Sequence, residues 1–145
     1  MGLPHPTEIL PHRSPFLFID EIIELNPGTS ARARWTLRPD TDFLAGHFPG
    51  EPVMPGVIII EALAQTGALA VLSEPSSRGK LALFAGIERA KFRRPVKPGE
   101  TLDLAMSLTR RRGPLGEGTA TAHVDGELAC EATLRFAIVD PGATE

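Results

Sequence analysis

GVIIIEALAQTGALAVL, residues 56–72, is the stretch of sequence that decides the fold. It follows Pro55 and ends before the Ser-Glu-Pro of residues 73–75, a pattern typical of a helix with these limits. Its polar side chains are Glu61, Gln65 and Thr66. A helix that is apolar on every side lies in a protein core or in a membrane. At ~1.5 Å per residue this one spans roughly 25 Å, short for a bilayer that needs ~20 residues, so we expect a buried helix.

Segments in which apolar and polar residues alternate lie before and after this helix. The expected strands are residues 31–37, 80–88, 101–110, 117–124 and 128–139. Residues 16–25 fit a strand or a helix, and Asp125-Gly126 favours a tight hairpin turn. We therefore predict an α+β fold, in which a mostly antiparallel sheet of five to six strands curls around the one long buried helix.

The rest of the sequence indicates a single ordinary domain. No repeat or linker divides residues 1–145, and we expect loose ends at residues 1–8 and 141–145. The net charge of −3 gives no reason to expect nucleic acid or an anionic membrane as partner. Cys130 is the only cysteine, so an internal disulfide is excluded, and the first residues lack the cationic start of a signal peptide. We expect a cytoplasmic protein.

Glu61 is the first candidate for chemistry, because a charged carboxylate in an apolar helix is costly to bury. Loss of hydration raises the pKa of a carboxyl group, which would make Glu61 a general acid near neutral pH. Gln65 lies one turn further along the same face and could orient Glu61. The sequence leaves two alternatives open: a structural hydrogen bond from Glu61 to the backbone, and a role for Gln65 only in a polar strip.

His47 is the second candidate. It lies in GHFPGEPVMPG, residues 46–56, where three glycines and three prolines predict a rigid loop leading into the helix. Its ordinary pKa, near ~6.5, suits a general base, although a plain surface histidine would fit the same position. The other histidines have no metal-ligand spacing with it, and we expect no metal site. They are His5, His12 and His123.

Gly56 is the third candidate, because it opens the helix. Unpaired backbone N–H groups and the positive end of the helix dipole point outward there, and they could hold a carbonyl oxygen and the enolate that forms when the α-proton leaves. A glycine required only by the turn is the alternative. Together Gly56, His47 and Glu61 supply an oxyanion donor, a base and an acid within fifteen residues.

Three stretches carry a family resemblance: LPHRSPFLFID (10–20), GHFPGEPVMPGVIIIEALAQ (46–65) and FAGIERAKFRRPVKPGE (84–100). They resemble the hot dog-fold (3R)-hydroxyacyl-acyl carrier protein dehydratases of type II fatty acid synthesis, in register over most of the chain. The resemblance implies that His47 and the acidic residue fourteen positions later, Glu61, are the catalytic pair and meet across a homodimer interface. The dehydratase/isomerase branch typically carries aspartate at the helix position, so Glu61 favours the plain dehydratase.

The resemblance also implies an acyl tunnel. Gly56 matches the glycine whose N–H contacts the thioester carbonyl. We also expect Gln65 to be a substrate-binding residue. Positions at the tunnel mouth or along its wall are Leu10, Pro11, His12, Phe48, Val57 and Phe84. Ser14 and Leu83 stand where relatives often have tyrosines, so the acyl chain-length preference is not transferable from the family.

The partners that the resemblance implies are an acyl carrier protein, which delivers the substrate on its phosphopantetheine arm, and a second copy of the chain. The homodimer would be the minimum active unit, with a trimer of dimers as a larger assembly, and no further cofactor is expected. A basic cluster would suit an acidic carrier, with solvated strand ends as the alternative. It comprises Lys91, Arg93, Arg94 and Lys97, and residues 110–112 could add to it.

Other functions stay open at this point. A hot dog acyl thioesterase would hydrolyse the thioester and has no need for the HFP loop. A carrier-binding module would bind the carrier protein without turnover. The dehydration itself could serve a specialised polyketide or polyene pathway in place of primary fatty acid elongation.

Overall fold

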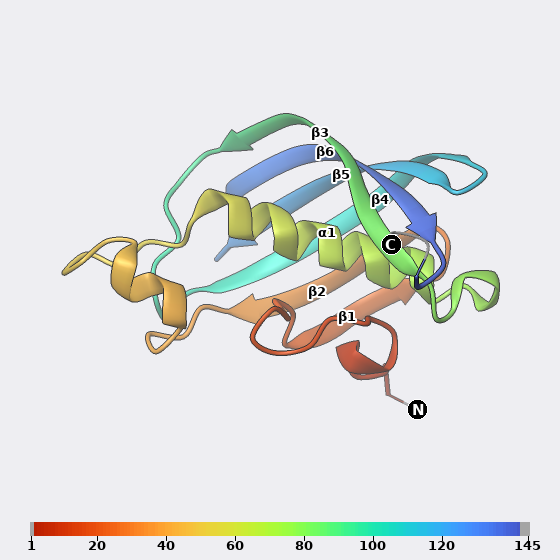
Figure 1. Cartoon of the computed structure of the whole chain (residues 1–145). Helices are drawn as coiled ribbons and strands as arrows, with labels where there is room; N and C mark the ends of the chain where they lie inside the picture. Colours follow the sequence, from red (N-terminus) through yellow and green to blue (C-terminus); the bar gives the residue numbers. More distant parts are fainter. Residues whose placement is uncertain (1, 143–145) are drawn as a thin grey trace.

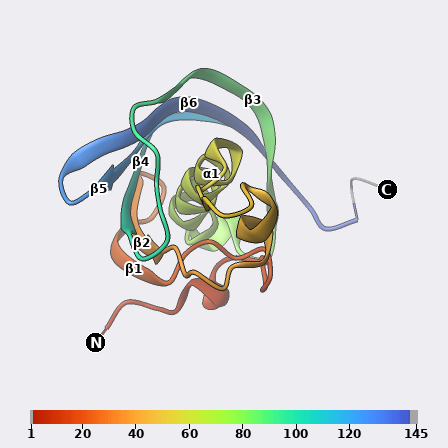
Figure 2. The same ribbon diagram turned by 90° about the vertical axis from the view of Figure 1, so that its left-hand side faces the viewer.

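The computed structural model describes residues 2–142, and its centre is α1 (Gly56–Leu72), enclosed by one antiparallel sheet. The six strands lie in the order β1-β2-β4-β5-β6-β3 (Figure 1). They are β1 (Glu21–Asn26), β2 (Ser30–Thr36), β3 (Leu81–Phe92), β4 (Thr101–Arg112), β5 (Leu115–Val124) and β6 (Glu127–Val139). Short 3₁₀ helices lie at Pro6–Glu8, Asp42–Gly46 and Pro75–Ser77. Figure 2 shows the sheet curving around the helix, which confirms the predicted fold and both helix limits.

The core forms where α1 packs on the concave face of the sheet. Leu63 and Leu69 of the helix have no exposed surface, and neither has Leu102 of β4. Buried polar groups on the helix have partners, as burial requires. The Thr66 hydroxyl, for example, donates to the Ala62 carbonyl at 2.9 Å. Within the described part of the chain, no helix combines the length and the hydropathy that crossing a bilayer requires.

The alternating pattern predicted the strand faces correctly. On β2, Ala31, Ala33 and Trp35 are buried, while the residues between them are exposed. The hairpin between β5 and β6 turns at Asp125 and Gly126, with φ angles of 49° and 80°. Two left-handed residues are what the tight two-residue hairpin turn requires, so the predicted turn is confirmed.

Two strand predictions differ from the structure. In residues 16–25 the strand begins only at Glu21, because a helix side chain takes the backbone bonds before it. The Phe18 N–H donates to Oε1 of Gln65 at 2.8 Å, and Nε2 of Gln65 donates to the Phe16 carbonyl at 3.2 Å. β3 runs to Phe92, past the predicted end at residue 88, with a register shift in the added part.

The N-terminal segment is more ordered than predicted. The His5 side chain accepts a hydrogen bond from the Thr7 N–H, and the Glu8 carboxylate accepts one from the His5 N–H at 2.6 Å. The Arg13 guanidinium donates to the Leu10 carbonyl at 2.7 Å and so closes the segment that follows. Residue 1 and residues 143–145, parts of the predicted loose ends, lie outside the described residues.

Leu69→Ala tests the core. Removing this fully buried side chain should lower the free energy of unfolding by about 2–5 kcal/mol, because the helix cannot collapse into the space left behind. Urea unfolding followed by circular dichroism measures it. Leu115→Ala, at a side chain that is 53% exposed, is the control and should change the free energy by less than about 0.5 kcal/mol. Equal losses in the two variants would contradict this assignment of the core.

Candidate active site

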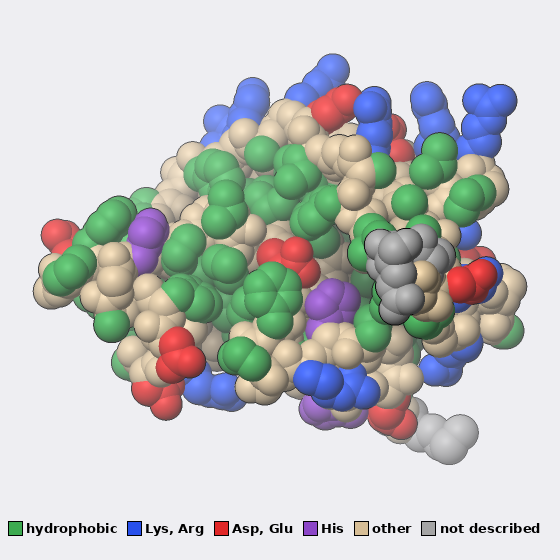
Figure 3. Space-filling model, viewed as in Figure 1, with side chains coloured by type: hydrophobic (Ala, Val, Ile, Leu, Met, Phe, Trp, Pro, Cys, Tyr) green, Lys and Arg blue, Asp and Glu red, His purple; other side chains and the backbone are tan. Residues whose placement is uncertain are grey.

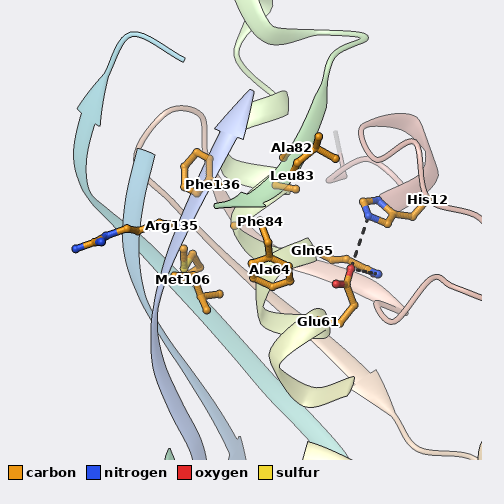
Figure 4. Close-up of a pocket in the computed structure, with 13 residues that line it drawn as sticks. His12, Glu61, Ala64, Gln65, Ala82, Leu83, Phe84, Met106, Arg135 and Phe136 are labelled. Atoms are coloured by element: carbon orange, nitrogen blue, oxygen red, sulfur yellow. Dashed lines mark hydrogen bonds and ion pairs between the residues drawn. The ribbon is translucent and has the colours of Figure 1, made fainter. Parts of the chain in front are cut away.

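Glu61 faces a narrow pocket between α1 and the sheet, with a volume of about 40 Å³ (Figure 4). Its lining is mostly apolar, apart from the polar groups beside Glu61. The lining residues are His12, Glu61, Ala64, Gln65, Gly67, Ala68, Ala82, Leu83, Phe84, Met106, Leu134, Arg135 and Phe136. The pocket therefore joins a carboxyl group to an apolar recess.

The carboxyl group of Glu61 is adapted to hold a proton. Its side chain is 18% exposed, and burial raises its pKa above the ordinary value of 4.5. The hydrogen bond from Gln65 opposes this rise but does not cancel it. A carboxyl group with a raised pKa is a better general acid near neutral pH.

Gln65 orients the carboxyl group of Glu61. Its own Oε1 already accepts the Phe18 N–H, so the amide cannot be reversed, and its Nε2 donates to Oε2 of Glu61 at 3.1 Å. Oε2 is thus held as an acceptor, which leaves Oε1 without a hydrogen bond to the described residues. Of the two roles left open by the sequence, the structure contains the one in which Gln65 orients Glu61.

His12 approaches the same carboxyl group, with its Nε2 3.8 Å from Oε2 of Glu61. Burial, and secondarily the charge of Arg13, lowers the pKa of His12. A neutral imidazole beside Glu61 leaves the carboxyl group free to stay protonated. The sequence did not predict this contact, because the two residues lie far apart in the chain and no spacing pattern links them.

His47 is held on its loop by two hydrogen bonds to one residue. Its Nδ1 lies 2.8 Å from the Val53 carbonyl oxygen, and the Val53 N–H donates to the His47 carbonyl at 2.8 Å. Since a carbonyl can only accept, Nδ1 carries the proton and Nε2 keeps its lone pair. The ring stacks on Phe48, with 4.1 Å between ring centroids. The arrangement leaves Nε2 able to accept a proton.

A steric contact explains the glycine at position 56, and the helix start there offers free N–H donors. A Cβ at this position would lie 2.6 Å from Cε1 of Phe92, so the ring requires a glycine. The helix has no side-chain N-cap, and the first of its N–H groups to find a partner is that of Ile58, which donates to the Pro55 carbonyl. In the described residues, the N–H groups of Gly56 and Val57 thus have no acceptor of their own.

The predicted site residues fall into separate places within one chain. Phe84 and Leu83 line the Glu61 pocket, with Gln65 and His12, whereas Leu10 is in the core and Pro11 is exposed. Gly56 and Val57 line a hollow beside Phe92, and Phe48 lines another beside residues 42–45. His47 lines neither the Glu61 pocket nor these two hollows.

The predicted basic cluster is partly engaged in ion pairs. Arg93 pairs with Glu131 at 3.4 Å, and Arg94 pairs with Glu100 and Glu127. Lys91 has no ion pair within residues 2–142, nor has Lys97. The two lysines are therefore the members of this cluster whose charges are free to meet a partner.

An exposed apolar area covers the face of the molecule that carries α1 and β3 (Figure 3). Large apolar side chains that are between 38% and 72% exposed include Val57 of α1, Leu83, Phe84, Ile87 and Phe92 of β3, and Phe48 of the loop before α1. β3 is also an edge strand, paired only with β6. A long edge strand with exposed apolar side chains is typical of an interaction surface.

Comparison with known proteins identifies the family. Residues 10–133 match the FabA-like domain. Curated relatives include the 3-hydroxyacyl-[acyl-carrier-protein] dehydratase FabZ of Chloroflexus aggregans and that of Staphylococcus carnosus, each 53% identical over 133 residues and 92% of both chains. That of Bacillus cereus is 52% identical over the same share. The chain belongs to the FabA-like family. Within this family it is a FabZ-type dehydratase, a hydro-lyase.

Solved structures place this FabA-like protein in the hot dog fold. The dehydratase heterocomplex ApeI:P of Xenorhabdus doucetiae has a chain with a TM-score of 0.82 at 20% identity, covering 99% of this chain and 95% of its own. A sigma28-regulated virulence protein of Campylobacter jejuni has a TM-score of 0.69 at 18% identity, covering 93% and 87%. At these identities the similarity shows the fold alone.

Glu61→Gln tests the burial of the carboxyl group. The pKa of Glu61 is higher in the folded chain than in the unfolded chain. The protonated carboxyl group therefore contributes stability that is fully present below the ordinary pKa, and this stability is lost as the pH rises through the raised pKa. Glutamine stays neutral throughout. The variant should therefore gain stability relative to the wild type as the pH rises above the ordinary pKa of 4.5. Thermal unfolding at a series of pH values measures it, and a difference that is constant with pH would contradict the raised pKa.

Proposed function

We propose that this FabZ-type enzyme converts (3R)-hydroxyacyl thioesters, carried by an acyl carrier protein, to trans-2-enoyl thioesters in fatty acid elongation. His47 is the base and Glu61 of the other subunit is the acid. The observation that carries the proposal is the Glu61 carboxyl group itself. It has a raised pKa, its Oε2 is held by Gln65, and it lines a mostly apolar pocket.

The first half of the reaction breaks the C2–H bond. Nε2 of His47 takes the proton, since Nδ1 is bonded to the Val53 carbonyl. Negative charge then develops on the thioester oxygen, where the free N–H groups of Gly56 and Val57 stabilise it with the positive end of the α1 dipole. The glycine required by Phe92 also lets the thioester approach the backbone closely.

The second half forms the C2=C3 double bond and breaks the C3–O bond. Oε1 of Glu61 gives its proton to the departing hydroxyl, which leaves as water. Glu61 is then ionised and His47 protonated, so one proton returned from His47 to Glu61 restores the starting state. Each step moves a proton between side chains and substrate, and the proposal therefore invokes no metal or further cofactor.

The active unit in this proposal is a homodimer, or a larger assembly such as a trimer of dimers. Two observations support a second copy of the chain as the missing half. His47 does not line the Glu61 pocket, and β3 is an edge strand of the described sheet with exposed apolar side chains. A second β3 edge would pair that strand and cover its apolar side chains.

Carrier binding and location complete the proposal. Lys91 and Lys97 are the charges that we assign to an acidic carrier protein. Residues 110–112 do not add to this cluster, because the strand register puts them at the other end of the sheet, where Arg111 pairs with Glu74 at 2.8 Å. We place the enzyme in the cytoplasm, where the single buried Cys130 would stay reduced.

His47→Ala and Glu61→Gln test the assigned roles. Each should lower kcat by about 100- to 10,000-fold, since each removes one proton-transfer group. The assay follows the absorbance of the enoyl product from a 3-hydroxybutyryl thioester, with circular dichroism to verify folding. Wild-type turnover in either variant would contradict the role of that residue.

Measuring free thiol in the same assay separates the dehydratase from a thioesterase. A dehydratase keeps the thioester bond and releases no thiol, whereas a thioesterase releases one thiol for each substrate consumed. Thiol release without enoyl absorbance would overturn the proposed reaction and leave the fold unaffected. Any turnover above background would exclude a carrier-binding module that has no catalytic activity.

A further inference from the structure

The Glu61 pocket has an outer and an inner end. In Figure 4, Glu61 and His12 lie on one side of Phe84, and Met106 and Phe136 lie on the other. Phe84 is 42% exposed, whereas Met106 and Leu134 are each 1% exposed. The acid therefore lies at the accessible end, and the recess ends at the sheet.

The inner end is apolar and is closed by Met106. The guanidinium of Arg135, which also contributes to the lining, turns away to Glu88 and Glu117, at 2.9 Å from each. No polar group of the described residues is left to recognise a functional group there. Such a recess accepts an unsubstituted hydrocarbon chain.

Two glycines give the Met106 side chain its position. A Cβ on Gly67 of α1 would lie 3.0 Å from Cγ and 3.1 Å from Cε of Met106. A Cβ on Gly118 of β5 would lie 2.5 Å from the same Cε. The thioether of Met106 thus occupies space that any side chain at positions 67 and 118 would fill. Methionine is unbranched and flexible, so it can yield to a ligand where a branched residue would not.

We propose that Met106, seated between Gly67 and Gly118, is the end wall of the acyl pocket and limits the chain length that the enzyme accepts. The inference rests on the proposed function, and it names Met106 as the residue that decides how long an unsubstituted acyl chain the pocket can hold. With Met106 in place the pocket has a volume of about 40 Å³, and Met106 and Leu134 at its inner end are each 1% exposed.

The test compares kcat/KM for (3R)-3-hydroxydodecanoyl and (3R)-3-hydroxybutyryl thioesters of carrier protein. Met106→Ala should raise the long-to-short ratio, by about fourfold for each methylene that the longer pocket buries. Gly67→Ala should lower the ratio, because the added methyl group pushes the thioether into the pocket. Alanine favours a helix over glycine, so this second variant is expected to fold even if the first does not.

Leu104→Ala is the matched control. Leu104 is buried two positions before Met106 on the same face of β4, yet it does not line the pocket. Its truncation loosens the core without moving the end wall, so the ratio should stay at the wild-type value. The inference is overturned if all three variants keep the wild-type ratio, or if Leu104→Ala changes it as Met106→Ala does. A wild-type protein that dehydrates neither substrate would instead overturn the proposed function.

Discussion

The side-chain amide of Gln65 connects the fold to the chemistry. It is 1% exposed, and both of its ends are engaged. Its bonds to Phe16 and Phe18 hold the segment before β1 against α1, and the bond to Oε2 of Glu61 orients the acid. A buried amide with fixed partners cannot rotate without leaving polar groups unpaired, and that cost makes the arrangement rigid. The acid inherits its orientation from the packing of the N-terminal segment.

The site that we propose draws its two proton-transfer groups from separate elements of the chain. Glu61 comes from the middle of the helix, where burial raises its pKa, and His47 comes from a proline- and glycine-rich loop that fixes its tautomer. The two groups need opposite environments. The acid must be poorly hydrated to keep its proton, while the base must present an unprotonated nitrogen. In the site that we propose, the two groups lie on separate elements and come together through a second copy of the chain, which meets both requirements.

Much of this architecture was predictable from local sequence patterns. The limits of α1 follow from Pro55 and residues 73–75, and the β5–β6 hairpin follows from Asp125-Gly126. Glu61 was identifiable because it is a carboxylate in an apolar helix.

What sequence patterns missed are contacts between distant segments. The strand in residues 16–25 began late because Gln65 takes the backbone bonds of Phe16 and Phe18. The His12–Glu61 contact and the seat of Met106 between two glycines depend on three-dimensional packing. Periodicity and spacing do not predict contacts between residues that lie far apart in the chain. The roles of His47 and Glu61 came from family resemblance, since each residue alone also has a plain structural explanation.

The most direct test of the central claim, a site shared between two subunits, is complementation between inactive variants. His47→Ala and Glu61→Gln chains are co-expressed with different affinity tags, and the mixed dimers are assayed for dehydration. A mixed dimer has one site with both residues intact and one with neither, so the purified mixed dimers should show about half of wild-type activity. Mixed dimers as inactive as either variant alone would contradict the shared site and place both groups within one chain.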